Sequence, residues 1–197
     1  MEFGFFLALG LSYLIGSLST AIIVCRVMGL GDPREGGSGN PGATNVKRLY
    51  GNKAAAITLA GDLLKGVVPV LIAYGFGFAP DQVFWIGFAA FIGHLYPVFF
   101  GFRGGKGVAT MLGVMLALHF WIGLAVVATW LFVAKVLKIS SLSALVASLL
   151  APFYLYGFTD QSAWVWGSAL MTLILFWRHR SNIRRILRGE ESLIKKA

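Results

Sequence analysis

The chain has 197 residues, of which 57% are hydrophobic and only 13% charged, and its mean hydropathy is +0.77. A soluble domain of this size could not cover so much apolar surface, so the composition excludes a water-soluble globular protein and predicts an integral membrane protein. The net charge is +9, but the basic residues stand between apolar runs, so membrane topology explains them better than nucleic-acid binding.

Seven apolar runs follow one another and predict an all-α protein whose helices span a membrane. They cover residues 3–25, 54–78, 82–100, 107–120, 121–137, 141–158 and 162–177. The first run lacks the basic start and the cleavage site of a signal peptide, so we expect it to be retained as a span. The 107–137 stretch is shorter than the ~40 residues that two full spans need. It is either a short helical hairpin that turns near His119 or one long span.

Basic residues decide between these alternatives because they gather in alternate connections. Of the 17 Lys and Arg residues, all but Lys65 lie in the first, third and fifth connections or in the C-terminal tail. By the positive-inside rule this pattern predicts seven transmembrane helices, with the N-terminus outside and the C-terminus cytoplasmic. One long span would put Lys135 and Lys138 outside, so we expect the hairpin at 107–137. We treat 1–197 as a single transmembrane domain.

The first polar stretch is Gly36–Asn45, which contains four glycines and is followed at once by Lys47 and Arg48. Successive glycines let backbone N–H groups converge on an oxyanion, and the short side chains of Ser38 and Thr44 add further donors. The same composition also marks an ordinary flexible linker. The predicted topology favours the anion-binding interpretation, because it puts this stretch on one side of the membrane with two others.

The second polar stretch is Gly93–Thr110, and within it Gly104–Gly107 resembles part of a phosphate loop. It lacks the full Walker pattern, which disfavours nucleotide hydrolysis. Glycine N–H groups and Lys106 at a helix N-terminus nevertheless suit a phosphate, although the two adjacent glycines are also consistent with a tight turn. Pro97 should kink the third apolar run near His94, to which we assign a supporting role.

The third polar stretch is Arg178–Glu191. His179 and Asn182 are three residues apart, so one helical face presents both. The arginines around them, together with an apolar strip, also fit a surface helix held against anionic lipid.

Asp62 and Lys65 lie three residues apart inside the second apolar run and can pair. Ionisable residues inside a membrane are functional candidates by default, and a structural ion pair is an equally good interpretation. The sequence has no His-x₄-Asp dyad, no Gly-x-Ser-x-Gly elbow and no Cys/His cluster with metal-ligand spacing.

Together the three stretches resemble the bacterial membrane-integral acyl-phosphate:glycerol-3-phosphate acyltransferases. The matching segments are Gly37–Asn45, Gly93–Phe99 with Gly104–Thr110, and His179–Ile183 with Gly189 and Glu191. The resemblance implies transfer of a fatty acyl group from acyl phosphate to the 1-hydroxyl of glycerol 3-phosphate, giving lysophosphatidic acid and inorganic phosphate. Together with the predicted topology, it places the enzyme in the bacterial inner membrane with its active site on the cytoplasmic side. We expect a monomer without cofactor, metal or nucleic-acid partner.

The hypothesis that follows gives catalytic roles to Ser38, Lys106, His179 and Asn182. The phosphate- and substrate-binding residues would be Gly39, Asn40, Gly42, Ala43, Thr44, Asn45, Arg48, His94, Arg103, Gly104, Gly105 and Gly107. Either a substrate phosphate oxygen or His179 would accept the alcohol proton.

Two other functions are weighed against this one. A small transporter or flippase for an anionic phosphate-containing substrate would use a similar basic pocket, but its polar groups should lie near the midplane of the membrane. A lipid phosphatase would need a nucleophile or a metal cluster.

Overall fold

The computed structural model describes residues 2–194, and within this range the chain forms ten α-helices, one short 3-10 helix and no strand. The helices are α1 (Glu2–Gly16), α2 (Thr20–Val27), α3 (Ala43–Tyr50), α4 (Asn52–Gly75), α5 (Pro80–Leu95), η1 (Val98–Phe100), α6 (Val108–Leu118), α7 (Phe120–Leu137), α8 (Ser140–Phe158), α9 (Ser162–Arg178) and α10 (Arg180–Leu187).

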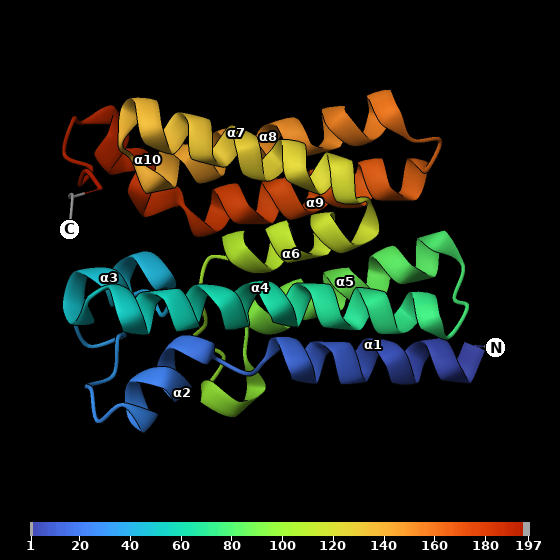
Figure 1. Ribbon diagram of the computed structural model, residues 1–197, viewed down its shortest axis with the longest axis horizontal. Coiled ribbons are helices and arrows are strands. Elements are labelled where there is room, and N and C mark those ends of the chain that lie inside the picture. The colour runs from blue at the N-terminus through green and yellow to red at the C-terminus, as the bar shows by residue number, and fades with distance from the viewer. Residues whose placement is uncertain (1, 195–197) are drawn as a thin grey trace.

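The long helices lie side by side along the long axis of the molecule, and the chain turns back at each end (Figure 1). Helices α7, α8 and α9 form one group and α1, α4 and α5 the other, with α6 between them. The short helices α3 and α10 and the loops on either side of them lie at one end, on the left of Figure 1. The N-terminus lies at the opposite end. The segment between α5 and α6, which carries the second polar stretch, lies between these short helices and the middle of the molecule (Figure 1). Ser38, Gly104 and Arg178, one residue from each polar stretch, line the same cavity.

Several helices are long and apolar enough to cross a membrane. Four pass by themselves (α4, α7, α8, and the segment Pro80–Phe100 that contains α5), and the bent pair of α1 and α2 makes a fifth if it is counted as one span. Large apolar side chains cover the outside of these helices; Phe3, Trp121 and Phe158 are each more than 70% exposed. Such a surface suits a hydrocarbon environment.

The hairpin expected at 107–137 is present. Helices α6 and α7 are separated by His119 alone, whose extended backbone (φ −152°, ψ 106°) reverses the chain. The His119 ring caps the new helix, because its Nδ1 accepts the Ile122 N–H at 3.4 Å. With 11 residues, α6 is too short to cross a bilayer unaided.

Two expectations need correction. The first apolar run is not one continuous helix, because it breaks between Gly16 and Thr20 and bends by 43°. Pro97 does not kink the third run but ends it: α5 stops at Leu95, since proline disfavours helical backbone in the residue before it.

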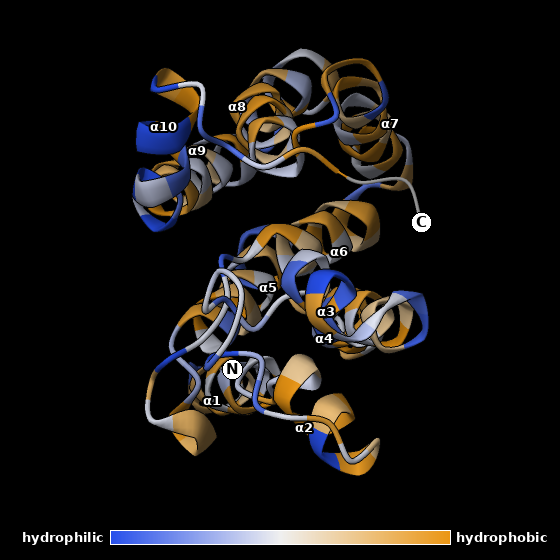
Figure 2. Ribbon diagram, turned by 90° about the vertical axis from the view of Figure 1, so that its left-hand side faces the viewer, coloured by the Kyte–Doolittle hydropathy of each residue, from blue (hydrophilic) through white to orange (hydrophobic). Residues whose placement is uncertain are grey.

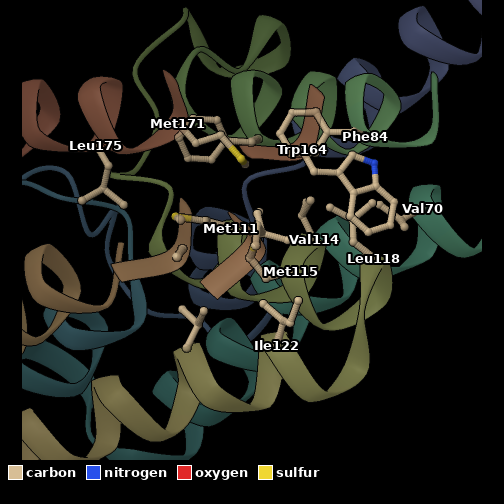
Figure 3. Close-up of a cluster of buried hydrophobic side chains, with 14 of the residues drawn as sticks. Val70, Phe84, Met111, Val114, Met115, Leu118, Ile122, Trp164, Met171 and Leu175 are labelled. Carbon is tan, nitrogen blue, oxygen red and sulfur yellow. The ribbon is translucent and has the colours of Figure 1, made fainter. Parts of the chain in front are cut away.

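The core lies where α4, α5, α6, α7 and α9 meet (Figure 3). Aromatic and sulfur-containing side chains fill it, including Phe84, Met111, Met115 and Met171, each no more than 2% exposed.

Close helix contact at small residues adds to this packing. A Cβ at Gly66 of α4 would collide with the carbonyl of Thr110 in α6, and one at Gly113 of α6 would collide with the carbonyl of Leu63. Gly113 therefore lets α6 approach α4 closely. This close approach fixes α6, and with it the polar loop that precedes α6, against α4.

Candidate active site

The Gly-rich stretch forms a fixed turn around the buried side chain of Asn45. The Asn45 amide nitrogen donates to the carbonyls of Pro33 and Gly36 at 2.9 and 3.1 Å, and its oxygen accepts the Ser38 N–H at 2.9 Å. Gly37 has φ +60°, a left-handed conformation that suits glycine. These contacts oppose the linker interpretation and leave Ser38 exposed at the tip of the turn.

Arg34 joins this turn to the segment that follows α5. Its guanidinium forms an ion pair with Asp32 at 2.7 Å and donates to the Phe100 carbonyl at 3.0 Å. The Arg34 hydrogen bond lowers the pKa of the Asp32 carboxyl. The first and second polar stretches are thus held together.

The second stretch presents Lys106 between two anchoring contacts. Gly105 N–H donates to the His94 carbonyl at 3.1 Å, while Arg178 of α9 donates to the carbonyls of Gly104 and Gly105 at 2.9 and 2.8 Å. The Lys106 ammonium donates to Asn182 Oδ1 at 2.5 Å. Burial lowers the pKa of Lys106 to about 8, with neighbouring cations contributing to the same shift.

In the third stretch Asn182 is oriented by a carboxylate. Glu191 Oε1 accepts from Asn182 Nδ2 at 2.6 Å and from Ser141 of α8 at 2.8 Å, and its Oε2 accepts from Arg185 at 2.6 Å. Because an ionised carboxylate only accepts, the Asn182 nitrogen must face Glu191 and its oxygen must face Lys106. Burial alone would raise the pKa of Glu191, but these hydrogen bonds outweigh it and lower the pKa.

His179 is buried beside this group, at the junction of α9 and α10. Its Nδ1 lies 2.9 Å from the Leu175 carbonyl, so Nδ1 carries the proton and Nε2 is left as an acceptor. Burial lowers the pKa of His179 to about 4, so the ring is neutral at pH 7.

The three stretches enclose a polar cavity of about 420 Å³ at this end of the bundle. Figure 2 looks onto this end, where hydrophilic segments of α3 and α10 stand in front of mostly hydrophobic helices. Four of the lining residues are cationic, and the described lining contains no carboxylate. The lining residues are Ser38, Gly39, Asn40, Gly104, Lys106, Arg178, Arg180, Ser181 and Arg184. Such a cavity suits an anion.

Only some of the predicted residues line this cavity. Ser38, Gly39, Asn40, Gly104 and Lys106 line it. Gly105 and Gly107 belong to the same loop as Lys106, and Gly107 (φ +90°) starts α6. Gly42 and Ala43 begin α3.

Other predicted residues face neighbouring elements. Thr44 Oγ1 lies 3.2 Å from Ser140 Oγ at the start of α8, and Arg48 donates to Ser192 at 3.0 Å. Arg103 is exposed, and His94 is buried beneath Gly105.

Sequence reasoning missed Arg178, Arg180, Ser181 and Arg184, because topology and lipid contact already explained the arginines. The four-residue spacing of Arg180 and Arg184 was the available signal, since it puts both on one face of α10 next to Ser181. Across residues 2–194 no group of three or more His, Cys, Asp or Glu side chains is arranged to hold a metal ion.

Comparison with known proteins gives a consistent result. A family model described as glycerol-3-phosphate acyltransferase matches residues 6–189. A glycerol-3-phosphate acyltransferase of Hydrogenovibrio crunogenus is 72% identical over 94% of this chain and 89% of its own length. The corresponding protein of Thioalkalivibrio sulfidiphilus is 58% identical over 93% and 90%.

The fold also has close matches among solved structures. The structure of PlsY, an integral membrane glycerol 3-phosphate acyltransferase, in its glycerol 3-phosphate form superposes with a TM-score of 0.92 at 35% identity, covering 98% of this chain and 96% of that one. The lysophosphatidic acid form gives a TM-score of 0.90 at 34% identity over 96% and 95%.

Proposed function

The chain belongs to the glycerol-3-phosphate acyltransferase family, and from this premise we propose that it takes a fatty acyl group from acyl phosphate and transfers it to the 1-hydroxyl of glycerol 3-phosphate. Acyl transfer to glycerol 3-phosphate is the activity of this multi-pass membrane enzyme. What we propose beyond this activity is the identity of the acyl donor, acyl phosphate, and of the hydroxyl that accepts the acyl group, the 1-hydroxyl. Formation of the product, lysophosphatidic acid, is the first step of phospholipid synthesis.

The observation that carries the proposal is the cationic lining of the polar cavity. Lys106, Arg178, Arg180 and Arg184 surround a space of about 420 Å³. Two phosphate groups brought together repel each other, and fixed cations in a partly buried site offset that repulsion better than water does. An acyl phosphate adds only one small anionic group to the cavity, and its chain can remain among the apolar helices.

The reaction needs little more than positioning. The glycerol 3-phosphate hydroxyl oxygen attacks the carbonyl carbon of the mixed anhydride, and the new ester bond forms as the bond from that carbon to the phosphate oxygen breaks. The bond breaks without prior protonation of the bridging oxygen. The hydroxyl proton passes to a non-bridging phosphate oxygen of the acyl phosphate, so inorganic phosphate is released as hydrogen phosphate. Holding both substrates in line supplies several kcal/mol of the barrier.

Four residues take the central roles in this proposal. Lys106 binds phosphate, and Asn182 holds the Lys106 ammonium in place. Ser38 fixes a hydroxyl or phosphate oxygen at the mouth of the cavity. His179 offers Nε2 as a second acceptor for the proton. The surrounding residues proposed to bind or frame the substrates are Gly39, Asn40, Gly42, Ala43, Thr44, Asn45, Arg48, His94, Arg103, Gly104, Gly105 and Gly107.

We further propose seven membrane spans, an outer N-terminus, and a cavity that opens to the cytoplasm at a bacterial inner membrane. The alternating direction of the helices in Figure 1 supports this arrangement, as does the gathering of basic residues in alternate connections. The protein is proposed to act as a monomer with a single domain over 1–197.

A comparison of donors tests the function. Purified protein in detergent is given labelled glycerol 3-phosphate with acyl phosphate, acyl-CoA or acyl carrier protein thioester in separate reactions. The proposal predicts that labelled lysophosphatidate forms only in the reaction whose acyl donor is acyl phosphate. Product of equal yield from acyl-CoA, without acyl phosphate, would contradict the proposed donor.

A further inference from the structure

A buried ionisable cluster lies beneath the Gly104–Gly107 loop, and the proposed acyl-transfer chemistry gives no role to its two residues in α4, Asp62 and Lys65. Asp62 Oδ1 lies 2.9 Å from Lys65 Nζ within α4, and both side chains are no more than 5% exposed. His94 Nδ1 of α5 lies 3.5 Å from the same carboxylate oxygen. Burying charges among apolar helices is energetically unfavourable, so packing alone does not account for this cluster.

The cluster reaches the loop through His94. The His94 carbonyl accepts the Gly105 N–H at 3.1 Å. The opposite edge of its ring faces Gly105 so closely that a Cβ on that residue would collide with His94 Nε2. The ring therefore lies between the Asp62 carboxylate and the Gly105 backbone.

Asp62 also holds the far side of the same loop. Its main-chain carbonyl accepts from Thr110 Oγ1 at 2.9 Å, in the first turn of α6. One residue of α4 thus contacts the helix before the loop with its side chain and the helix after the loop with its backbone.

Lys65 in turn fixes the Asp62 carboxylate. Its ammonium donates to the Leu18 carbonyl at 3.0 Å, at the break between α1 and α2 where helical hydrogen bonding is interrupted. Lys106 follows Gly105 directly, so rotation of the Gly105 peptide would move the Lys106 side chain in the cavity.

We propose that Asp62 is a positioning residue for acyl transfer: paired with Lys65, it orients the His94 ring, which holds Gly105 and thereby directs Lys106 into the cavity. The inference rests on the proposed function, because it takes Lys106 as the phosphate-binding cation. Displacement of a reacting group by about 1 Å can cost roughly a hundredfold in rate.

The test replaces the ion pair by apolar side chains in the double variant Asp62→Leu with Lys65→Met. Such replacements of buried pairs are often neutral for stability, so they separate a structural role from a positioning one. The inference predicts a melting temperature near that of the wild type and a kcat/KM that is lower by roughly tenfold to a hundredfold.

A second measurement on the same variant is the alkaline limb of its pH–rate profile. A looser loop admits water to Lys106, so the limb should move from about 8 toward 10.5, the ordinary value for lysine. The charged groups that face Lys106 stay unchanged in this variant, so a moved limb reports the hydration of Lys106 itself. They are Arg48, Arg178, Arg185 and Glu191.

Ser12→Ala is the matched control. It removes another buried hydrogen bond, from Ser12 to the Ile86 carbonyl between α1 and α5, away from the loop. It should leave the alkaline limb in place. If the double variant fails to fold, His94→Leu is used instead, because it keeps the Asp62–Lys65 pair. It should likewise lower kcat/KM and move the alkaline limb toward 10.5.

A folded double variant, or a folded His94→Leu, with wild-type rate and limb would overturn the inference. The proposed function fails differently, since the wild type itself would then make no lysophosphatidate from acyl phosphate.

Discussion

Lys106 stands where the second and third polar stretches meet, 76 positions before the Asn182 that accepts its hydrogen bond. The phosphate-binding role proposed for it comes from the sequence, because a lysine after two glycines at a helix start suits a phosphate. Its contact with Asn182 was not predictable, because no local pattern links residues so far apart. The same limit applies to Asn45, which was expected among the binding residues and which the structure uses to hold the Ser38 turn.

The pH dependence of transfer tests the role of Lys106. Burial lowers its pKa to about 8, and only the protonated form attracts phosphate. We expect kcat/KM to be retained below pH 8 and to fall about tenfold per pH unit above it. Any residual activity of Lys106→Arg should lack this limb, because arginine stays charged. Lys106→Ala should lose at least about a hundredfold in rate.

Lys47→Ala is the control for that experiment, because it removes an exposed lysine from α3. This variant should keep both the wild-type rate and the fall in kcat/KM above pH 8. Near-normal turnover in Lys106→Ala would exclude the phosphate-binding role.

At the level of helices, periodicity and charge predicted most of the elements. The turn at His119 followed from run length and from the positions of Lys135 and Lys138. The break between α1 and α2 was not predicted, because residues 3–25 contain neither a charged residue nor a proline. The Leu18 carbonyl at the break accepts from Lys65 of another helix, which no local pattern reveals. The part that α10 plays in lining the cavity was missed for a similar reason, since membrane topology and contact with anionic lipid account for arginines in such a helix equally well.

Close packing of α4 against α6 gives a prediction at this scale. Gly66→Leu would drive a side chain into the Thr110 carbonyl, so it should destabilise the protein by about 1–3 kcal/mol and lower its melting temperature in detergent. Gly4→Leu is the matched change, because nothing lies within 4 Å of a Cβ there. Equal melting temperatures for the two variants would contradict the packing described here.

For the whole molecule, the account depends on one end of the bundle facing the cytoplasm. In a Cys25→Ala background, Glu190→Cys places a single exposed thiol just after α10, and Asp81→Cys places one in the first turn of α5. Helix α10 and the start of α5 lie toward opposite ends of the bundle (Figure 1). A membrane-impermeant thiol reagent should label the Asp81→Cys protein in intact spheroplasts. It should label the Glu190→Cys protein only after the membrane is opened. The reverse pattern would invert the proposed topology.

The most direct test of the central claim follows both halves of the reaction at once. Acyl phosphate labelled with ³²P and glycerol 3-phosphate labelled with ¹⁴C are given to the purified protein, and both products are counted over time. The account predicts that inorganic [³²P]phosphate and [¹⁴C]lysophosphatidate appear in equal amounts in the wild type, and that both disappear in Lys106→Ala. Phosphate release without lysophosphatidate, or lysophosphatidate that forms without phosphate release, would contradict it.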